Sequence, residues 1–167
     1  MENIVRIQLL AAGLLTIATP ALAETPVLTV LTYDSFTSEW GPGPAIETAF
    51  EATCACDLQF IHAGDGAALL ARIQLEGAAS EADIVLGLDT SLTAAATATQ
   101  LFAPHGKNPA LNLPVDYADP TFLPFDWGWF AFVHDKTKLP DPPKTFEALA
   151  ASDLKIVIQD PRSSTPG

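Results

Sequence analysis

Aromatic and acidic residues follow the first two predicted strands of the chain, where a binding site could form. Tyr33 ends an apolar run, Trp40 comes shortly after it, and Asp65 and Gly66 follow a second apolar run. Aromatic ring faces attract organic cations by ~0.5–2 kcal/mol each, and a carboxylate adds Coulombic attraction and a hydrogen-bond acceptor. With few basic residues nearby, this set favours a small cation whose charge is delocalised.

Each of these residues also fits a purely structural role. Asp65 and Asp89 both stand just before a helical pattern, where an aspartate commonly caps the first turn. Tyr33 and Trp40 could bury their rings in a core instead of lining a site. The sequence by itself leaves both interpretations open.

The last residues of the sequence offer another possible contact point. Ser164 and Thr165 precede Pro166, and Thr165 with Pro166 suits a helix start, an N-cap followed by proline in the first turn. The N–H groups of such a start also suit a phosphate or hydroxyl ligand. Because the sequence stops on the opening of another element, we expect it to be a fragment of a longer protein.

Support for catalysis is thin. His62, His105 and His134 are scattered over predicted strands and a loop. The sequence has no Gly-x-Ser-x-Gly elbow, Walker loop or Gly-x-Gly-x-x-Gly motif. We therefore expect a binding protein without catalytic residues and without a cofactor, and we keep a secreted hydrolase as the alternative.

The two cysteines, Cys54 and Cys56, are close neighbours in the sequence. Structural zinc needs four ligands, more than this pair and His62 provide. In an oxidising compartment a cysteine pair usually forms a disulfide. A structural disulfide or two inert thiols is therefore favoured over metal or redox chemistry, and no metal site is predicted.

The net charge and the amino-terminal segment restrict the partners and the location. Eight basic residues against 20 acidic ones give a net charge of -12, which argues against a nucleic-acid partner because such binding needs a basic surface. An apolar run over Ile7–Thr19 follows Arg6, and Ala21 and Ala23 are small residues of the kind a signal peptidase reads. The run is shorter than the ~20 residues of a membrane span. We predict a signal peptide over residues 1–23, cleaved after Ala23.

Strands and helices are predicted to alternate over the first part of the mature chain. Apolar runs predict strands at 28–33, 58–62 and 82–88. Helical patterns follow each strand, with core-facing positions Ile46, Ala49, Phe50 and Thr53 after Pro44, then Leu69, Leu70 and Ile73 before Gly77, and a last helix over 91–99. This alternation predicts an α/β fold with a parallel sheet. Since ligands collect beyond the carboxyl ends of parallel strands, Tyr33 and Asp65 are placed at one edge.

The rest of the sequence is predicted to be less regular. Repeated prolines over 103–124 exclude helices and strands and suggest a connection between lobes. Two further strands are predicted at Trp127–His134, whose tryptophans favour core positions, and at Lys155–Ile158. Between them, Thr145 can cap a short helix through Ala150.

Several sequence blocks, taken together and in order, resemble the periplasmic thiamine-binding proteins of ABC importers. The resemblance runs from about Pro26 to Gly167. Its blocks are Thr32–Phe36 (TYDSF), Trp40–Pro44 (WGPGP), Cys54–Cys56 (CAC), Asp65–Gly66 (DG), Ala82–Asp89 (ADIVLGLD), Pro124–Val133 (PFDWGWFAFV) and Gln159–Gly167 (QDPRSSTPG).

The resemblance implies a two-lobed periplasmic binding protein of type II. In this interpretation residues 24–124 form most of the first lobe with its connecting loop, and residues 125–167 form a hinge-crossing strand and the start of the second lobe. Such a protein binds thiamine, and also its phosphate esters, in the periplasm and hands it to the permease subunits of the importer. Members of the family are about twice as long as this chain.

The resemblance also assigns the candidate site. By matching position, Asp65 and Gly66 contact the ligand from the first lobe, and Ser164 and Thr165 contact it from the second. Tyr33 and Trp40 match aromatic residues expected to line the cleft. A binder of a polyamine or of ferric ion is the alternative within the same class. Ferric ion needs clustered tyrosines, whereas the sequence holds only Tyr33 and Tyr117.

Overall fold

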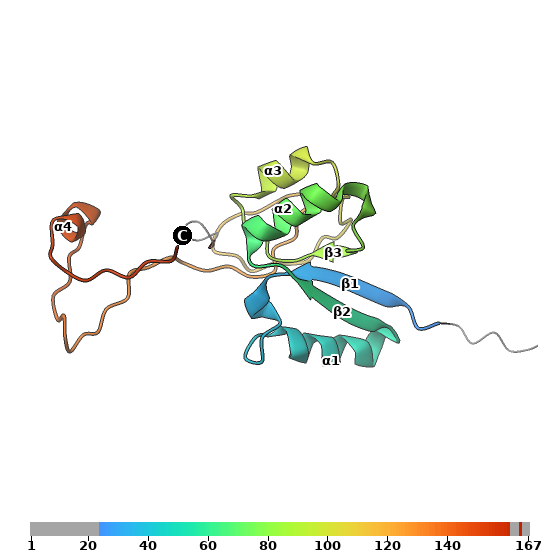
Figure 1. Ribbon diagram of the computed structural model, residues 1–167, viewed down its shortest axis with the longest axis horizontal. Helices are drawn as coiled ribbons and strands as arrows, with labels where there is room; N and C mark the ends of the chain where they lie inside the picture. Colours follow the sequence, from blue (N-terminus) through green and yellow to red (C-terminus); the bar gives the residue numbers. More distant parts are fainter. Residues whose placement is uncertain (1–23, 161–163, 165–167) are drawn as a thin grey trace, which may run out of the picture.

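A computed structural model describes residues 24–160 and residue 164, and its centre is a three-stranded parallel sheet (Figure 1). The strands are β1 (Val27–Thr32), β2 (Asp57–His62) and β3 (Ile84–Val85), in the order β2-β1-β3. Val27 lies opposite Asp57 at one end of the β1–β2 pair, and Thr32 lies opposite His62 at the other. The predicted parallel α/β arrangement is confirmed, although β3 is shorter than the predicted strand at 82–88.

Helices cover both faces of this sheet. The helices are α1 (Gly43–Cys54), α2 (Gly66–Glu76), α3 (Thr93–Ala98) and α4 (Phe146–Ala150), with 3₁₀ turns η1 (Asp34–Phe36) and η2 (Gly77–Ala79). Figure 1 shows α1 on one face of the sheet and α2 with α3 on the other. The crossovers between parallel strands thus bury both sides of the sheet, as expected for this class of fold.

The face under α2 holds the main core. Leu31 from β1 packs with Leu69 and Ile73 from α2, and Val85 and Phe102 pack around them. The three positions of α2 predicted to face the core, Leu69, Leu70 and Ile73, are buried. Burying a leucine or isoleucine side chain contributes about 1.5–3 kcal/mol each, so this face accounts for much of the local stability.

The face under α1 is less well covered than the sequence pattern predicts. The helix begins at Gly43 with Pro44 in its first turn, as predicted, but Phe50 keeps 42% of its surface exposed. α1 packs along β2, which is an edge strand and gives the helix only a narrow surface to cover. The buried ring on this side is Phe36, which contacts the ring of Phe60 at a centroid distance of 5.5 Å.

A disulfide joins Cys54, the last residue of α1, to Cys56, next to the first residue of β2. Ala55 between them has a φ of 51°, in the left-handed region. Among residues 24–160 and 164, no three His, Cys, Asp or Glu side chains are grouped so as to hold a metal ion. Cys54 and Cys56 therefore form a disulfide, one of the two states that the sequence left open for them.

Two predicted strands do not form. Trp127–His134 and Lys155–Ile158 are extended but belong to no sheet, and both lie along the part of the molecule that leads to α4 in Figure 1. Their apolar side chains are exposed, with Val133 at 95% and Val157 at 84%. Strand propensity records how well a residue fits a paired, half-buried surface, and no strand pairs with these segments in the described part of the chain.

Two other predictions for the later part of the chain are confirmed. Residues 103–124 contain neither helix nor strand. Thr145 caps α4 by accepting a hydrogen bond from the Ala148 N–H at 3.1 Å. No helix in the described ranges has the length and apolarity that crossing a membrane requires.

Candidate functional site

The loops that leave β1 and β2 are joined at the carboxyl ends of the strands. The Ala63 N–H donates to the Thr32 carbonyl at 3.1 Å, and the Asp34 N–H donates to the Gly64 carbonyl at 2.9 Å. These bonds place Tyr33 and Asp34 beside the turn that leads into Asp65. We call Tyr33, Asp34, Gly64, Asp65 and Gly66 the β1–β2 rim.

Tyr33 is half-buried and its ring is fixed by two neighbours. It meets Phe36 edge to face, with ring centroids 5.6 Å apart and planes at 71°. On another side it lies against Gly87, where an added Cβ would be 2.3 Å from the Tyr33 Cδ1. Tyr33 thus packs against the core while part of its surface stays accessible, and its predicted role in the site stays open.

A later segment brings a carboxylate to the same ring. Phe125 contacts Phe36 with a centroid distance of 5.6 Å, and Asp126 follows it. Burial, and then the negative charge of Asp126, raise the pKa of the Tyr33 phenol. The phenol therefore stays protonated at neutral pH. Asp126 was missed as a site residue because no local pattern places it near Tyr33.

Asp65 is the N-cap of α2. Its carboxylate accepts a hydrogen bond from the Ala67 N–H at 3.2 Å, and its carbonyl accepts one from the Leu69 N–H at 2.8 Å. Gly66 is the buried first residue of the helix. The cap interpretation is confirmed, and it also fixes the carboxylate at the rim, where a cation would be attracted.

Asp89 does not cap a helix, contrary to prediction. α3 starts only at Thr93, and its N-cap is Leu92. The Asp89 carboxylate instead accepts from the N–H and the hydroxyl of Ser91, at 2.9 and 2.6 Å. These bonds form an Asx turn ahead of the helix, which is the local alternative that aspartate side chains offer the backbone.

Trp40 is a highly exposed aromatic residue. It is in the loop between η1 and α1, and 80% of its surface is exposed. No ring contact within the described residues involves it. A core role for Trp40 is therefore wrong, and its exposed face leaves the predicted cleft role open.

Of the two predicted residues near the end of the sequence, the structure describes Ser164. The Ser164 N–H donates to the Asp160 carbonyl at 2.9 Å, and its hydroxyl donates to the Gln159 side chain at 2.9 Å. Thr165 lies outside the described residues, as do residues 1–23 with the predicted cleavage after Ala23. No hydrogen bond recorded between described residues joins Ser164 to the rim. Of the predicted site residues that the structure describes, the rim brings together Tyr33, Asp65 and Gly66.

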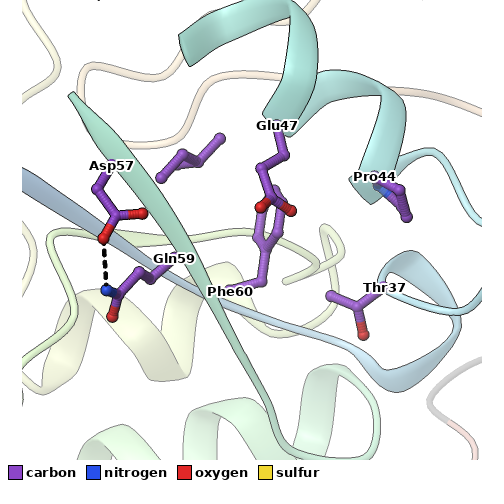
Figure 2. Close-up of a pocket in the computed structure, with 7 residues that line it drawn as sticks. Thr37, Pro44, Glu47, Asp57, Gln59 and Phe60 are labelled. Atoms are coloured by element: carbon purple, nitrogen blue, oxygen red, sulfur yellow. Dashed lines mark hydrogen bonds between the residues drawn. The ribbon is translucent and has the colours of Figure 1, made fainter. Parts of the chain in front are cut away.

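A separate hollow of about 390 Å³ lies between α1 and the outer edge of β2. Figure 2 shows the labelled side chains around it, including Glu47, Asp57 and Phe60, and the Asp57 carboxylate accepting a hydrogen bond from Gln59 at 2.8 Å. None of the predicted site residues lines this hollow. It is open and acidic, and it is not the candidate site.

Comparison with known proteins gives a consistent result, although no protein-family model matches the chain. The thiamine-binding periplasmic protein of Salmonella typhimurium is 54% identical over 92% of this chain and 48% of its own length. The Escherichia coli protein of the same name is 50% identical over 92% of this chain and 48% of its own length. The Brucella suis protein of that name is 50% identical over 89% of this chain and 45% of its own length.

A solved structure agrees with these sequence matches. A structure described as a periplasmic thiamin binding protein superposes with a TM-score of 0.80 at 48% identity, covering 91% of this chain and 49% of that one. At 48% identity the two proteins are similar in sequence as well as in fold. The chain spans about half the length of the curated relatives it matches.

Proposed function

Since the chain is a homologue of the periplasmic thiamine-binding proteins, we propose that it forms one part of a thiamine-binding protein that serves import. The observation that carries this proposal is the 54% identity over 92% of the chain with a relative of that name. The bound vitamin is cargo and not a cofactor. We propose no catalytic residue, because binding and release suffice for this role.

The chemistry of the β1–β2 rim supports a thiamine ligand. Thiamine carries a permanent positive charge on its thiazolium ring and has a flat aminopyrimidine ring. Tyr33 presents an aromatic surface, and Asp65 and Asp126 bring carboxylates to the same end of the sheet. Ring faces and carboxylates both attract such a cation.

We further propose a two-lobed arrangement of type II. Residues 24–124 form most of the first lobe, and residues 125–167 cross the hinge and begin the second, which holds Ser164 and Thr165. The exposed apolar side chains of the extended segments support this division, because they suit burial by further chain. Trp40, in the first lobe, would line the cleft. Bonds from both lobes stabilise the closed state over the open one.

The proposal includes location and partners. Residues 1–23 are a signal peptide cleaved after Ala23, and the mature protein acts in the periplasm, where it delivers thiamine or a thiamine phosphate to the permease of an ABC importer. The excess of acidic residues supports a cationic ligand and not a nucleic acid.

The proposal is tested by completing the protein. Residues 24–167 are joined to the carboxyl-terminal half of the Salmonella typhimurium relative, and thiamine binding is measured by calorimetry and by thermal unfolding. We expect saturable binding and a raised Tm, since a ligand specific for the native state stabilises it by about 2.7 kcal/mol at 100 times its Kd. Tyr33→Ala and Asp65→Ala should each weaken binding at least about tenfold, a loss of ~1.4 kcal/mol.

The remaining outcomes discriminate the alternatives. Residues 24–167 without the added half should bind thiamine weakly or not at all. A folded, completed protein that ignores saturating thiamine contradicts the proposal, and a shift with spermidine or ferric ion in its place would favour the alternative ligands. Tight binding that survives both substitutions would mean that the added half alone recognises the vitamin.

A further inference from the structure

One aspartate of the β1–β2 rim is bonded to the next loop through both its backbone and its side chain. The Asp34 N–H donates to the Gly64 carbonyl at 2.9 Å, and the Asp34 Oδ1 accepts from the Gly64 N–H at 2.8 Å. The two residues are 30 positions apart in the sequence. Asp34 therefore satisfies both backbone groups of Gly64.

The residue held in this way has an unusual backbone. Gly64 has a φ of 69°, and a Cβ there would lie 3.0 Å from the Cβ of Ala68 in α2. The next residue is Asp65, whose carboxylate caps α2. A change in the backbone at Gly64 would therefore change the direction of the Asp65 side chain and the start of the helix.

His62 completes the arrangement. Its Nδ1 lies 3.0 Å from the same Asp34 Oδ1, so this single oxygen meets two polar neighbours within the protein. Both side chains are well exposed, with 61% of the His62 side chain and 63% of the Asp34 side chain accessible. An exposed polar contact of this kind contributes little to global stability. The effect of Asp34 is therefore expected in the local order of the loop.

We propose that Asp34 is a positioning residue for the ligand site: it holds Gly64 so that the Asp65 carboxylate and the start of α2 face the ligand. This inference rests on the proposed function. Asp34 does not contact thiamine itself. Without the Asp34 acceptor, the Gly64 N–H turns to water and the loop samples other conformations. A ligand then binds the competent fraction only, which lowers the apparent affinity in proportion.

The chain contains a matched control. Asp83 makes the same pair of bonds to Thr29: its N–H donates to the Thr29 carbonyl at 2.9 Å, and its Oδ2 accepts from the Thr29 N–H at 2.8 Å. Asp83 precedes β3 and so lies toward the amino ends of the strands. Removing its carboxylate breaks an equivalent clamp away from the rim.

The test compares Asp34→Ala, Asp34→Asn and Asp83→Ala in the completed protein described above, with the exchange rate of the Gly64 amide hydrogen measured beside the Kd for thiamine. Asp34→Ala should weaken thiamine binding about tenfold, the loss expected from one charge-assisted hydrogen bond, and speed Gly64 exchange. Asp34→Asn keeps an acceptor oxygen, so it should restore most of the thiamine affinity and most of the protection of the Gly64 amide. Asp83→Ala should lower Tm to a similar extent as Asp34→Ala while leaving the Kd unchanged.

Three results would overturn the inference. The first is an unchanged Kd in Asp34→Ala. The second is an Asp34→Asn variant that protects Gly64 but still binds weakly, since that would make the Asp34 charge a direct ligand contact. The third is equal Gly64 exchange in Asp34→Ala and the parent. If the parent itself does not bind thiamine, the proposed function fails, while the exchange comparison still decides whether Asp34 holds the loop.

Discussion

At the scale of single residues, the rim depends on close packing behind the side chains that face outward. Tyr33 lies against Gly87, whose φ of 115° favours glycine and whose missing side chain leaves room for the ring. Thr32, one residue earlier, is fully buried, and its hydroxyl has no hydrogen-bond partner among the described residues. Both positions give predictions that are independent of the ligand.

Gly87→Ala is expected to displace Tyr33 and destabilise the fold. The new Cβ would overlap the ring, and the backbone would also be strained, which by itself costs about 1–3 kcal/mol. Gly106→Ala is the control, because Gly106 also has a positive φ but its Cβ would meet nothing within 4 Å. Urea unfolding should show a larger loss for Gly87→Ala, and equal losses would contradict the contact with Tyr33.

Thr32→Val is expected to raise the free energy of unfolding. Valine has nearly the shape of threonine and removes a buried hydroxyl that lacks a partner, a group whose desolvation costs about 1–3 kcal/mol. Thr32→Ala serves as the comparison, since it removes the hydroxyl but leaves a cavity, and it should not stabilise. Denaturant titration measures both variants. A destabilised Thr32→Val variant would show that the hydroxyl has a partner.

At the scale of elements, hydrogen bonds hold the proline-rich connection over residues 103–124, which contains neither helix nor strand. The His105 Nε2 lies 2.9 Å from the Asp119 carbonyl, and the His105 Nδ1 accepts from the Lys107 N–H at 2.9 Å. The Asp119 carboxylate accepts from the backbone N–H groups of Thr121 and Phe122, at 2.8 and 2.9 Å. These hydrogen bonds order the proline-rich connection in place of the backbone hydrogen bonds of paired strands.

Asp119→Asn is expected to destabilise the protein at neutral pH but not in acid. Hydrogen bonds from Phe122 and then Thr121 lower the pKa of Asp119 in the folded state. A lowered pKa gives stability above the unfolded value of ~3.9, and this stability is lost as pH falls through the folded value. Denaturant unfolding at pH 7 and pH 3 should show the difference from the parent shrinking in acid. A difference independent of pH would contradict the role of the charge.

At the scale of the whole molecule, the described residues form a compact part with a sheet and core and an extended part that carries α4 (Figure 1). The compact part contains the β1–β2 rim. The extended part exposes apolar side chains, among them Trp129 and Phe130. Such a surface suits burial by the further chain that relatives of twice this length possess.

Limited trypsin digestion of residues 24–167 should cut the extended part first. Lys136, Lys138 and Lys155 are exposed, and the segments around them contain little regular structure. Arg72 lies within α2 and donates to Glu76 at 2.6 Å. Local opening is easiest where few buried contacts resist it. Mass spectrometry of the early fragments should show cleavage after the lysines before cleavage after Arg72, and the reverse order would contradict this description.

Local patterns in the sequence were enough to predict the parallel α/β order, the strands β1 and β2, the buried face of α2 and the caps at Asp65 and Thr145. These features follow from local spacing, since a periodic apolar pattern or a capping residue acts within a few positions of itself. Three other features could not be predicted from those patterns: the hydrogen bonds between Asp34 and Gly64, the position of Asp126 beside Tyr33, and the absence of a strand at Trp127–His134. Each of these depends on whether a partner distant in the sequence is present, and local propensity carries no information about such a partner.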